Sequence, residues 1–311
     1  MSNTGSPSVL VVGGVNIDLV TRVTRCPKPG ETVIGRSFET IPGGKGANQA
    51  VTAARLGAKT WLGGCVGADS FGELQRNSLS AEGIDLTYLK THDTDPTGTA
   101  IIFVAEEGEN VIVVVPAANF GLLPADIEAM AGLFTKLDAV VMQLESRMET
   151  VEATLKAARK ASVLSVLDAG PAQKVPQQIL ELADIVSPNE TEAEAITGLK
   201  ANTLEEARKC AGRLIETGAR EVVLKLGAKG ALYMSIDEWF HVPAFEVNAI
   251  DTVAAGDAFT AALAVAWRKM HRRDAIRFAN AAGALATLTP GAQPSMPTLA
   301  AVEAFLRERT S

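Results

Sequence analysis

AVVMQLESRMETVEATLKAARKASVLSVL, residues 139–167, indicates the fold class more clearly than any other stretch of the chain. It begins with the apolar run 139–144 and ends with the apolar run 163–167, both typical of short buried strands. Further short apolar strands are expected at 185–186 and 222–226, again separated by helical stretches. Alternation of this kind is typical of a parallel sheet with helices on both faces. We therefore expect an α/β fold.

The first part of the chain adds one buried strand and two strand-rich stretches. The β-branched run 9–12 predicts the buried strand, and a helix is expected from Ala47 to Leu56, ending at Gly57. Residues 16–40 alternate polar and apolar side chains, and residues 97–118 contain two strand-like runs around a hairpin loop at 106–110. We expect these two stretches to form one small sheet, a lid on the α/β body, within a single domain over residues 1–311.

Composition narrows the class of partner. The formal charge is −7 and no Lys/Arg-rich run occurs, so a nucleic-acid partner is not expected. Cys26, Cys65 and Cys210 form no CxxC pair, which indicates reduced thiols without a zinc site or a disulfide framework. The N-terminus lacks a charged region before an apolar one, and the longest apolar run, around 261–267, is too short to span a bilayer. We expect a cytoplasmic protein with no membrane partner.

The strongest chemical motif is DTVAAGD at 251–257, which precedes a helical run at 258–270. Small residues allow the backbone amides of 255–257 to point at an oxyanion, and a helix N-terminus favours negative charge. Asp257 lies in the first turn, where its carboxylate could accept a proton from a substrate hydroxyl, an arrangement that suits phosphoryl transfer. The alternative is that Asp257 is only a helix cap. From this motif alone the two interpretations are equally good.

Two further motifs could bind a polar ligand. PGGKGAN at 42–48 places three glycines and a lysine at a helix start, although it could also be a flexible turn. Asn16 and Asp18 alternate on one face of a strand and could bind a polyol, or could be a solvent-facing strand edge. The glycines after the first strand do not fit the dinucleotide fingerprint GxGxxG, which argues against a nicotinamide-dependent oxidoreductase. Gly44-Lys45 is followed by Gly46 and not by serine or threonine, so it is not a Walker P-loop.

Taken together, eight ordered segments resemble the ribokinase-like, phosphofructokinase-B family of carbohydrate kinases. They cover nearly the whole chain, and their order is far more specific than any one of them. Within the family, GGKGANQA, MQLE and GAQPS are most similar to its ribokinase members. The segments are GGVNID at 13–18, GGKGANQA at 43–50, GEN at 108–110, MQLE at 142–145, PNETEAE at 188–194, LGAKG at 226–230, DTVAAGD at 251–257 and GAQPS at 291–295.

The resemblance implies a ribokinase-like three-layer body and ATP-dependent phosphorylation of a small sugar. D-Ribose, phosphorylated at its 5-hydroxyl, is the expected substrate, and 2-deoxyribose, fructose or another hexose, a keto sugar acid or a nucleoside are the alternatives. The implied cofactors are ATP, Mg²⁺ and an activating K⁺. A homodimer through the lid is also implied, since pairing two lids would cover open strand edges. A sugar-binding regulator without turnover is a rival, against which Asp257, Gly256 and Asn189 argue.

The resemblance also assigns the site residues. Asp257 would be the base, beside anion-hole amides of Ala255 and Gly256. The sugar would be bound by Asn16, Asp18, Gly43, Gly44, Asn48 and Glu145, with apolar contacts from Ala100 and Ile112. The nucleotide would be bound by Asn189 and Glu192 near the phosphates and Mg²⁺, by Lys225, Gly227 and Gly230, and by Asn280 near the adenine. The monovalent cation would be held by Asp251, Val253, Gly291 and Ser295.

Some of these assignments have structural alternatives. Asn189 and Glu192 could be a helix cap and its capping-box partner. Ala100 and Ile112 would fit any half-buried sheet. Glu145 ends a buried apolar strand, where a lone acid is costly unless it is paired or liganded, so a functional role is favoured there.

Four places depart from the family pattern. DAGPA at 168–172 replaces NPAPA, and Lys225 stands where threonine is common; both lie on the nucleotide side and are expected to alter phosphate contacts. PAAN at 116–119 replaces a glycine-containing stretch near the sugar and the lid. Val253-Ala254 replaces the usual Thr-Gly and is expected to stiffen the anion-hole turn.

Overall fold

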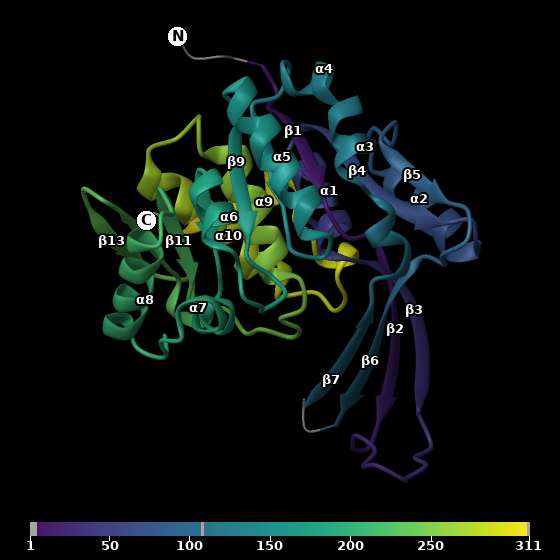
Figure 1. Cartoon of the computed structure of the whole chain (residues 1–311). Coiled ribbons are helices and arrows are strands. Elements are labelled where there is room, and N and C mark those ends of the chain that lie inside the picture. The colour runs from purple at the N-terminus through teal and green to yellow at the C-terminus, as the bar shows by residue number, and fades with distance from the viewer. Residues whose placement is uncertain (1–4, 107–108, 310–311) are drawn as a thin grey trace.

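The structure is a computed structural model of the chain, and it describes residues 5–106 and 109–309. It contains a nine-stranded sheet and a separate four-stranded sheet (Figure 1). Residues 107 and 108 lie outside the described residues. Part of the loop expected at 106–110 and part of the GEN motif therefore also lie outside them. None of the helices in the described part of the chain has the length and apolarity needed to cross a membrane.

The large sheet has the order β13-β12-β11-β10-β9-β8-β1-β4-β5. From β11 to β5 every neighbouring pair is parallel, which confirms the predicted α/β body. At the other edge β12 is antiparallel to β11 and β13 is antiparallel to β12, because the short connections 226–230 and 236–238 leave no room for a crossover helix. The strands are β1 (Ser8–Val12), β4 (Lys59–Gly67), β5 (Leu89–His92), β8 (Ala139–Met142), β9 (Leu164–Asp168), β10 (Ile185–Ser187), β11 (Glu221–Lys225), β12 (Ala231–Ser235) and β13 (Trp239–Val242).

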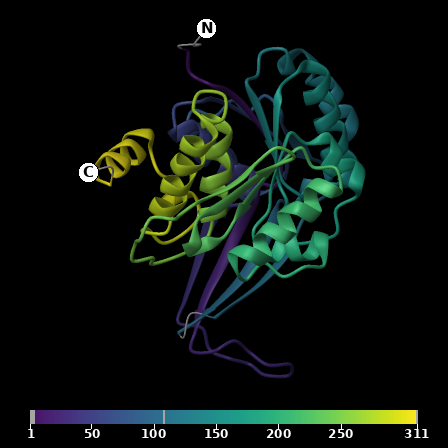
Figure 2. The same cartoon turned by 90° about the vertical axis from the view of Figure 1, so that its left-hand side faces the viewer.

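Helices cover both faces of this sheet and make two hydrophobic cores (Figure 2). The central strand β1 contributes to both, since Val9 and Val11 belong to one core and Leu10 and Val12 to the other. One layer consists of α1 (Lys45–Arg55), α2 (Ser70–Ala81), α9 (Ala255–Ala266), α10 (Arg272–Ala286) and α11 (Leu299–Glu308). The other consists of α3 (Pro124–Ala129), α4 (Ala131–Phe134), α5 (Met148–Ala161), α6 (Gln177–Leu182), α7 (Glu190–Thr197) and α8 (Leu204–Glu216). Three short 3₁₀ helices are η1 (Ala117–Gly121), η2 (Gly227–Lys229) and η3 (Gln293–Ser295).

The small sheet is built from the two strand-rich stretches, as predicted. Its order is β3-β2-β6-β7, and it extends away from the body of the molecule (Figure 1). The inner strands run parallel to one another, whereas each outer strand is antiparallel to its neighbour. We call this sheet the lid; its strands are β2 (Asn16–Val23), β3 (Ser37–Gly43), β6 (Gly98–Ala105) and β7 (Asn110–Val115).

Candidate active site

The N-terminus of α9 carries an anion-binding arrangement of backbone amides. Residues 255–257 form the first turn, whose amides have no partner within the helix. The amide of Ala255 donates to the carbonyl of Thr252 at 3.3 Å, so it is engaged in this structure. Among the described residues no acceptor is found for the amides of Gly256 and Asp257. These two amides, at the positive end of the helix dipole, are the available donors for an oxyanion.

Two of the departures from the family pattern place alanine where the backbone is left-handed. Ala254, the N-cap residue of α9, has φ 60°, and Ala117, at the start of η1, has φ 43°. Such a conformation costs a residue with a β-carbon about 1–2 kcal/mol, and glycine adopts it readily. The substitution of Ala254 for the usual glycine therefore adds strain beside the anion hole, which agrees with the stiffer turn expected from the sequence.

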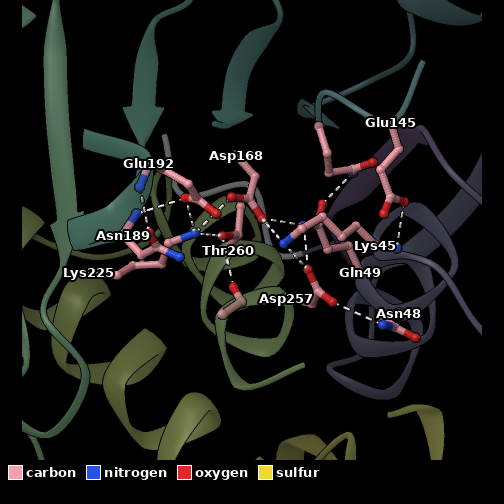
Figure 3. Close-up of polar contacts among 12 residues, drawn as sticks. Lys45, Asn48, Gln49, Glu145, Asp168, Asn189, Glu192, Lys225, Asp257 and Thr260 are labelled. Carbon is pink, nitrogen blue, oxygen red and sulfur yellow. Dashed lines mark hydrogen bonds and ion pairs between the residues drawn. The ribbon is translucent and has the colours of Figure 1, made fainter. Parts of the chain in front are cut away.

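Asp257 is buried and its carboxylate is held by side chains of α1. Asn48 Nδ2 donates to Oδ2 at 2.9 Å and Gln49 Nε2 donates to Oδ1 at 3.1 Å (Figure 3). Lys45 Nζ lies 3.5 Å from Oδ1. Because the N-cap position belongs to Ala254, the interpretation of Asp257 as a helix cap is wrong. A carboxylate held by three donors and facing a cavity can act as a proton acceptor.

Glu145 caps the other helix of the site. It follows β8, and its Oε2 accepts a hydrogen bond from the backbone amide of Lys45, the first residue of α1, at 3.0 Å. A β-carbon on Gly14 would fall 2.1 Å from Oε2, so glycine is required there. Burial raises the pKa of Glu145 to about 7; Lys45 opposes this effect and Asp257 adds to it. Glu145 is therefore hydrogen-bonded to the N-terminus of α1, yet burial makes its ionised form unfavourable.

Asn16 and Asp18 point from the lid toward the body. Their side chains are 2% and 8% exposed, so the interpretation of a solvent-facing strand edge is wrong. Asn16 Oδ1 accepts a hydrogen bond from Asn119 Nδ2 at 2.6 Å. Asp18 has no hydrogen-bond partner among the described residues, and burial raises its pKa to about 7, with Glu145 and Asp257 adding to the effect. Three carboxylates thus share one buried region, where hydroxyl donors would satisfy them.

The remaining sugar-side predictions lie around these carboxylates. Asp18 lies opposite Ala100 in the lid, and a β-carbon on Gly43 would fall 2.3 Å from Asp18 Oδ2. Ile112 lies on the same face of the lid, but it pairs with Ile102, two residues farther along β6 than Ala100, and it is 49% exposed. Gly44 has φ 90° at the N-cap of α1, and the buried Asn48 Oδ1 has no partner in the described residues. The structure brings all of these except Ile112 close to Asp257, Asp18 or Glu145.

A cavity of about 660 Å³ lies on the other side of Asp257. Its wall includes the turn at 255–257 and the side chain of Lys45. All of the predicted nucleotide-side residues line it: Asn189, Glu192, Lys225, Gly227, Gly230 and Asn280. Asn280 also donates to the carbonyls of Val242 and Pro243, at 3.2 and 3.1 Å. Six residues from three separate segments of the sequence therefore lie around one cavity.

Asn189 and Glu192 are both a capping box and part of this cavity. Asn189 Oδ1 accepts from the Glu192 amide, and Glu192 Oε2 accepts from the Asn189 amide, each at 2.8 Å. The structural alternative is thus confirmed, and it does not remove them from the site. Burial raises the pKa of Glu192; the positive charge of Lys225 opposes this increase, and the negative charge of Asp168 adds to it.

Several polar residues that connect the two sides of the site were not predicted as site residues. Asp168 at the end of β9 is fully buried and accepts from Gln49 Nε2 and Lys225 Nζ, both at 2.8 Å (Figure 3). Burial would raise the pKa of Asp168, but Lys225 and Lys45 outweigh it and the pKa is lowered. Gln143 in turn donates to Gln49 Oε1. The sequence did contain a pattern that indicates them: polar residues stand at the ends of neighbouring parallel strands, and such strand ends meet at one edge of the sheet.

The predicted cation-site residues lie in two loops that Asp251 connects. Asp251 Oδ1 accepts from the Val253 amide at 3.0 Å, and Oδ2 accepts from the Gly291 amide at 2.9 Å. Ser295 is buried in the turn that follows, and its hydroxyl donates to the carbonyl of Ala292 at 2.8 Å. In the residues that the structure describes, no group of three or more His, Cys, Asp or Glu side chains is placed to hold a metal ion.

Comparison with known proteins agrees with this architecture. The model of the pfkB family carbohydrate kinases matches residues 6–299. A ribokinase from Haemophilus influenzae is 40% identical over 292 residues, which cover 94% of this chain and 95% of the relative. A deoxyribokinase from Salmonella typhi is 38% identical over 252 residues, 81% of this chain and 82% of the relative.

The solved structure of Arabidopsis thaliana ribokinase, complexed with ribose and ATP, superposes with a TM-score of 0.90 at 33% identity. The superposition covers 97% of this chain and 99% of that one. The sequence family and the fold therefore agree, and the chain belongs to the pfkB family of carbohydrate kinases.

Proposed function

We propose that this carbohydrate kinase transfers the γ-phosphoryl group of ATP to the 5-hydroxyl of D-ribose. The observation that carries the proposal is the position of Asp257 between two compartments. On one side lie the buried carboxylates of Asp18 and Glu145, and on the other lies the 660 Å³ cavity with the free amides of α9. A polyol fits the first compartment and a nucleotide fits the second.

Asp257 would take the proton of the sugar hydroxyl. As it does so, the hydroxyl oxygen forms a bond to the γ-phosphorus, the bond from that phosphorus to the bridging oxygen of ADP breaks, and ADP leaves with that electron pair. Asn48 and Gln49 orient the base, since each donates to one of its oxygens. The amides of Gly256 and Asp257 would stabilise the charge on the transferred group, and such preorganised donors are commonly the largest single contribution to catalysis.

ATP and Mg²⁺ fit the residues of the cavity. Mg²⁺ in kinases is usually bound by one or two carboxylates together with phosphate oxygens and water. Glu192 is a buried carboxylate on the cavity wall, and burial raises its pKa, so a divalent cation would stabilise its ionised form. We propose that Glu192 and Asn189 hold the Mg²⁺ and its water, and that Gly227, Gly230 and Asn280 line the nucleotide. When bound, Mg²⁺ neutralises charge on the phosphates.

A K⁺ site is proposed at the loops joined by Asp251. Each carboxylate oxygen of Asp251 accepts one backbone amide and has further lone pairs, and Ser295 donates its hydroxyl proton elsewhere, which leaves its oxygen able to coordinate. Oxygen donors from Asp251, Val253, Gly291 and Ser295 fit a large monovalent cation. The ion would stabilise the turn that leads into α9.

A homodimer through the lid is supported by the exposure of its outer strand. Val111 to Val115 of β7 are five consecutive apolar side chains, each 44–52% exposed, and Phe38 on β3 is 63% exposed. Both are edge strands of the lid, which natural proteins usually cover. A second copy of the chain would cover these residues.

Ribose is favoured over 2-deoxyribose by Asp18. Its buried carboxylate has no partner among the described residues, so it needs a donor from the ligand. A sugar that lacks that hydroxyl leaves the carboxylate unsatisfied, at a cost of about 1–3 kcal/mol. The deoxyribokinase relative keeps the alternative open. An assay of ADP release with ribose, 2-deoxyribose, fructose, a keto sugar acid and a nucleoside tests the proposal: ribose should have the highest kcat/KM, and a tenfold preference for another acceptor would contradict it.

A further inference from the structure

A buried ion pair joins the ends of two strands at the wall of the cavity. Lys225 ends β11 and Asp168 ends β9, with β10 between them. Lys225 Nζ lies 2.8 Å from Asp168 Oδ1, and the two side chains are 10% and 0% exposed. Figure 3 shows this pair between Glu192 on one side and Gln49 on the other.

The ammonium group of Lys225 lies beside the anion hole. It is 3.8 Å from the position that a β-carbon would occupy on Gly256, and the Gly256 amide has no acceptor in the described residues. Lys225 also donates to Thr260 Oγ1 at 3.4 Å, and that hydroxyl donates to the Gly256 carbonyl at 2.9 Å. The ammonium and the amide thus face the same end of the cavity.

The third proton of Lys225 has no hydrogen-bond acceptor among residues 5–106 and 109–309. Asp168 and Thr260 accept the other two, and Glu192 Oε2 is 3.9 Å away. An ammonium group has three donors, so one is left for a ligand. Positive charge is scarce here, because two lysines, Lys45 and Lys225, lie among five carboxylates: Asp18, Glu145, Asp168, Glu192 and Asp257.

The pair also combines two departures from the family pattern that lie 57 positions apart in the sequence. Asp168 stands at the first position of the stretch where asparagine is usual, and Lys225 stands where threonine is common. Replacing a neutral pair by an aspartate and a lysine leaves the net charge of the site unchanged. A purely structural ion pair and a catalytic one would both satisfy that balance.

We propose that Lys225 is a catalytic residue that binds the transferred phosphoryl group, and that Asp168 positions its ammonium group. The inference rests on the proposal that the cavity holds ATP. An ammonium group that is largely buried stabilises developing phosphate charge strongly, and lysine is a common phosphate ligand. Asp168 orients the ammonium group of Lys225 before the nucleotide enters.

The test compares the affinity for ATP with that for ADP by calorimetry, together with kcat and the melting temperature. The variants are Lys225→Met and the doubly substituted Lys225→Met/Asp168→Asn. Since only ATP carries the γ-phosphate, we expect Lys225→Met to weaken ATP binding about tenfold more than ADP binding. The kcat should fall by about 10²-fold, as for loss of one oxyanion donor. Lys90→Met, which removes a surface partner of Asp126, is the matched control and should change neither ratio nor kcat.

The double variant separates the two explanations even if Lys225→Met alone does not fold. Removing both charges restores neutrality, so its melting temperature should return toward that of the unaltered protein. If Lys225 contacts the phosphoryl group, ATP selectivity and kcat stay low in the double variant. Recovery of both would overturn the proposal. If the unaltered protein binds neither ATP nor ADP, both the proposed nucleotide site and this inference are refuted. If Lys225→Met loses its selectivity for ATP but the unaltered protein does not phosphorylate ribose, only the proposal that ribose is the substrate is refuted.

Discussion

Asp257→Asn removes the proton acceptor while it preserves the shape of the side chain. In the structure Asn48 Nδ2 and Gln49 Nε2 each donate to one carboxylate oxygen, at 2.9 and 3.1 Å. An asparagine amide nitrogen would face one of these donors. Asn48 Oδ1, however, is buried without a partner, so the Asn48 amide can turn over and accept from the new group. Lys45 keeps Asp168 at 3.8 Å. The free energy of unfolding should therefore change by about 1 kcal/mol or less.

The rate should respond very differently. Loss of a general base lowers kcat by about 10²–10⁴-fold, whereas ribose contacts through Asp18 and Glu145 remain. We expect the dissociation constant for ribose, measured by calorimetry, to stay within about threefold, a difference below 1 kcal/mol. Asp274→Asn, an exposed substitution on α10, is the control and should leave both quantities unchanged. A kcat near that of the unaltered protein would refute the base assignment; loss of folding and sugar binding together would make Asp257 a structural residue.

Four other outcomes are expected. Asp18→Ala should raise the KM for ribose and reduce the difference in kcat/KM between ribose and 2-deoxyribose. In the unaltered protein this difference reflects the cost of about 1–3 kcal/mol for leaving the Asp18 carboxylate unpaired. An unchanged difference would argue against a role for Asp18 in sugar recognition. The pKa of Asp18 is raised from 3.8 to about 7, first by burial and then by Glu145 and Asp257, so its ionisation costs stability as the pH rises through that window. Asp18→Asn should therefore raise the melting temperature of the sugar-free protein more at pH 8 than at pH 5, and the opposite order would contradict the raised pKa. Because Asp251 joins the loops before α9, K⁺ should raise kcat above that in a bulky organic cation, and equal rates would exclude the cation site. Val113→Asp, on the exposed strand β7, should give monomers by light scattering where the unaltered protein gives dimers; monomers in both would refute the lid interface.

The sheet body could be predicted because its central strands are short, apolar and separated by helices. The runs at 139–144, 163–167, 185–186 and 222–226 correspond to β8, β9, β10 and β11, each shifted by no more than about two residues, which is the usual uncertainty at element ends. The antiparallel edge formed by β12 and β13 was not predicted. Local apolar patterns do not specify strand direction, which here follows from the two short connections 226–230 and 236–238.

The site was predictable only as far as local motifs extend. The motif at 251–257 left the role of Asp257 open between cap and base; Ala254 takes the N-cap position, and donors from α1, more than 200 positions away in sequence, hold the Asp257 carboxylate. Asp168 and Lys225 were each noticed as departures, but their pairing depends on the distance between the ends of β9 and β11. The sequence indicated a stiffer turn at Val253-Ala254, but the left-handed backbone that strains Ala254, with φ of 60°, is seen only in the structure.

The position of the phosphoryl group on the product tests the proposed activity most directly. The protein would be incubated with D-ribose, ATP, Mg²⁺ and K⁺, and the product examined by ³¹P NMR with coupling to protons. Transfer to the 5-hydroxyl predicts a phosphorus signal coupled to two methylene protons, formed in step with ADP and not formed by Asp257→Asn. A phosphate coupled to the single anomeric proton, or ATP that remains unchanged in the presence of ribose, would contradict the proposed reaction.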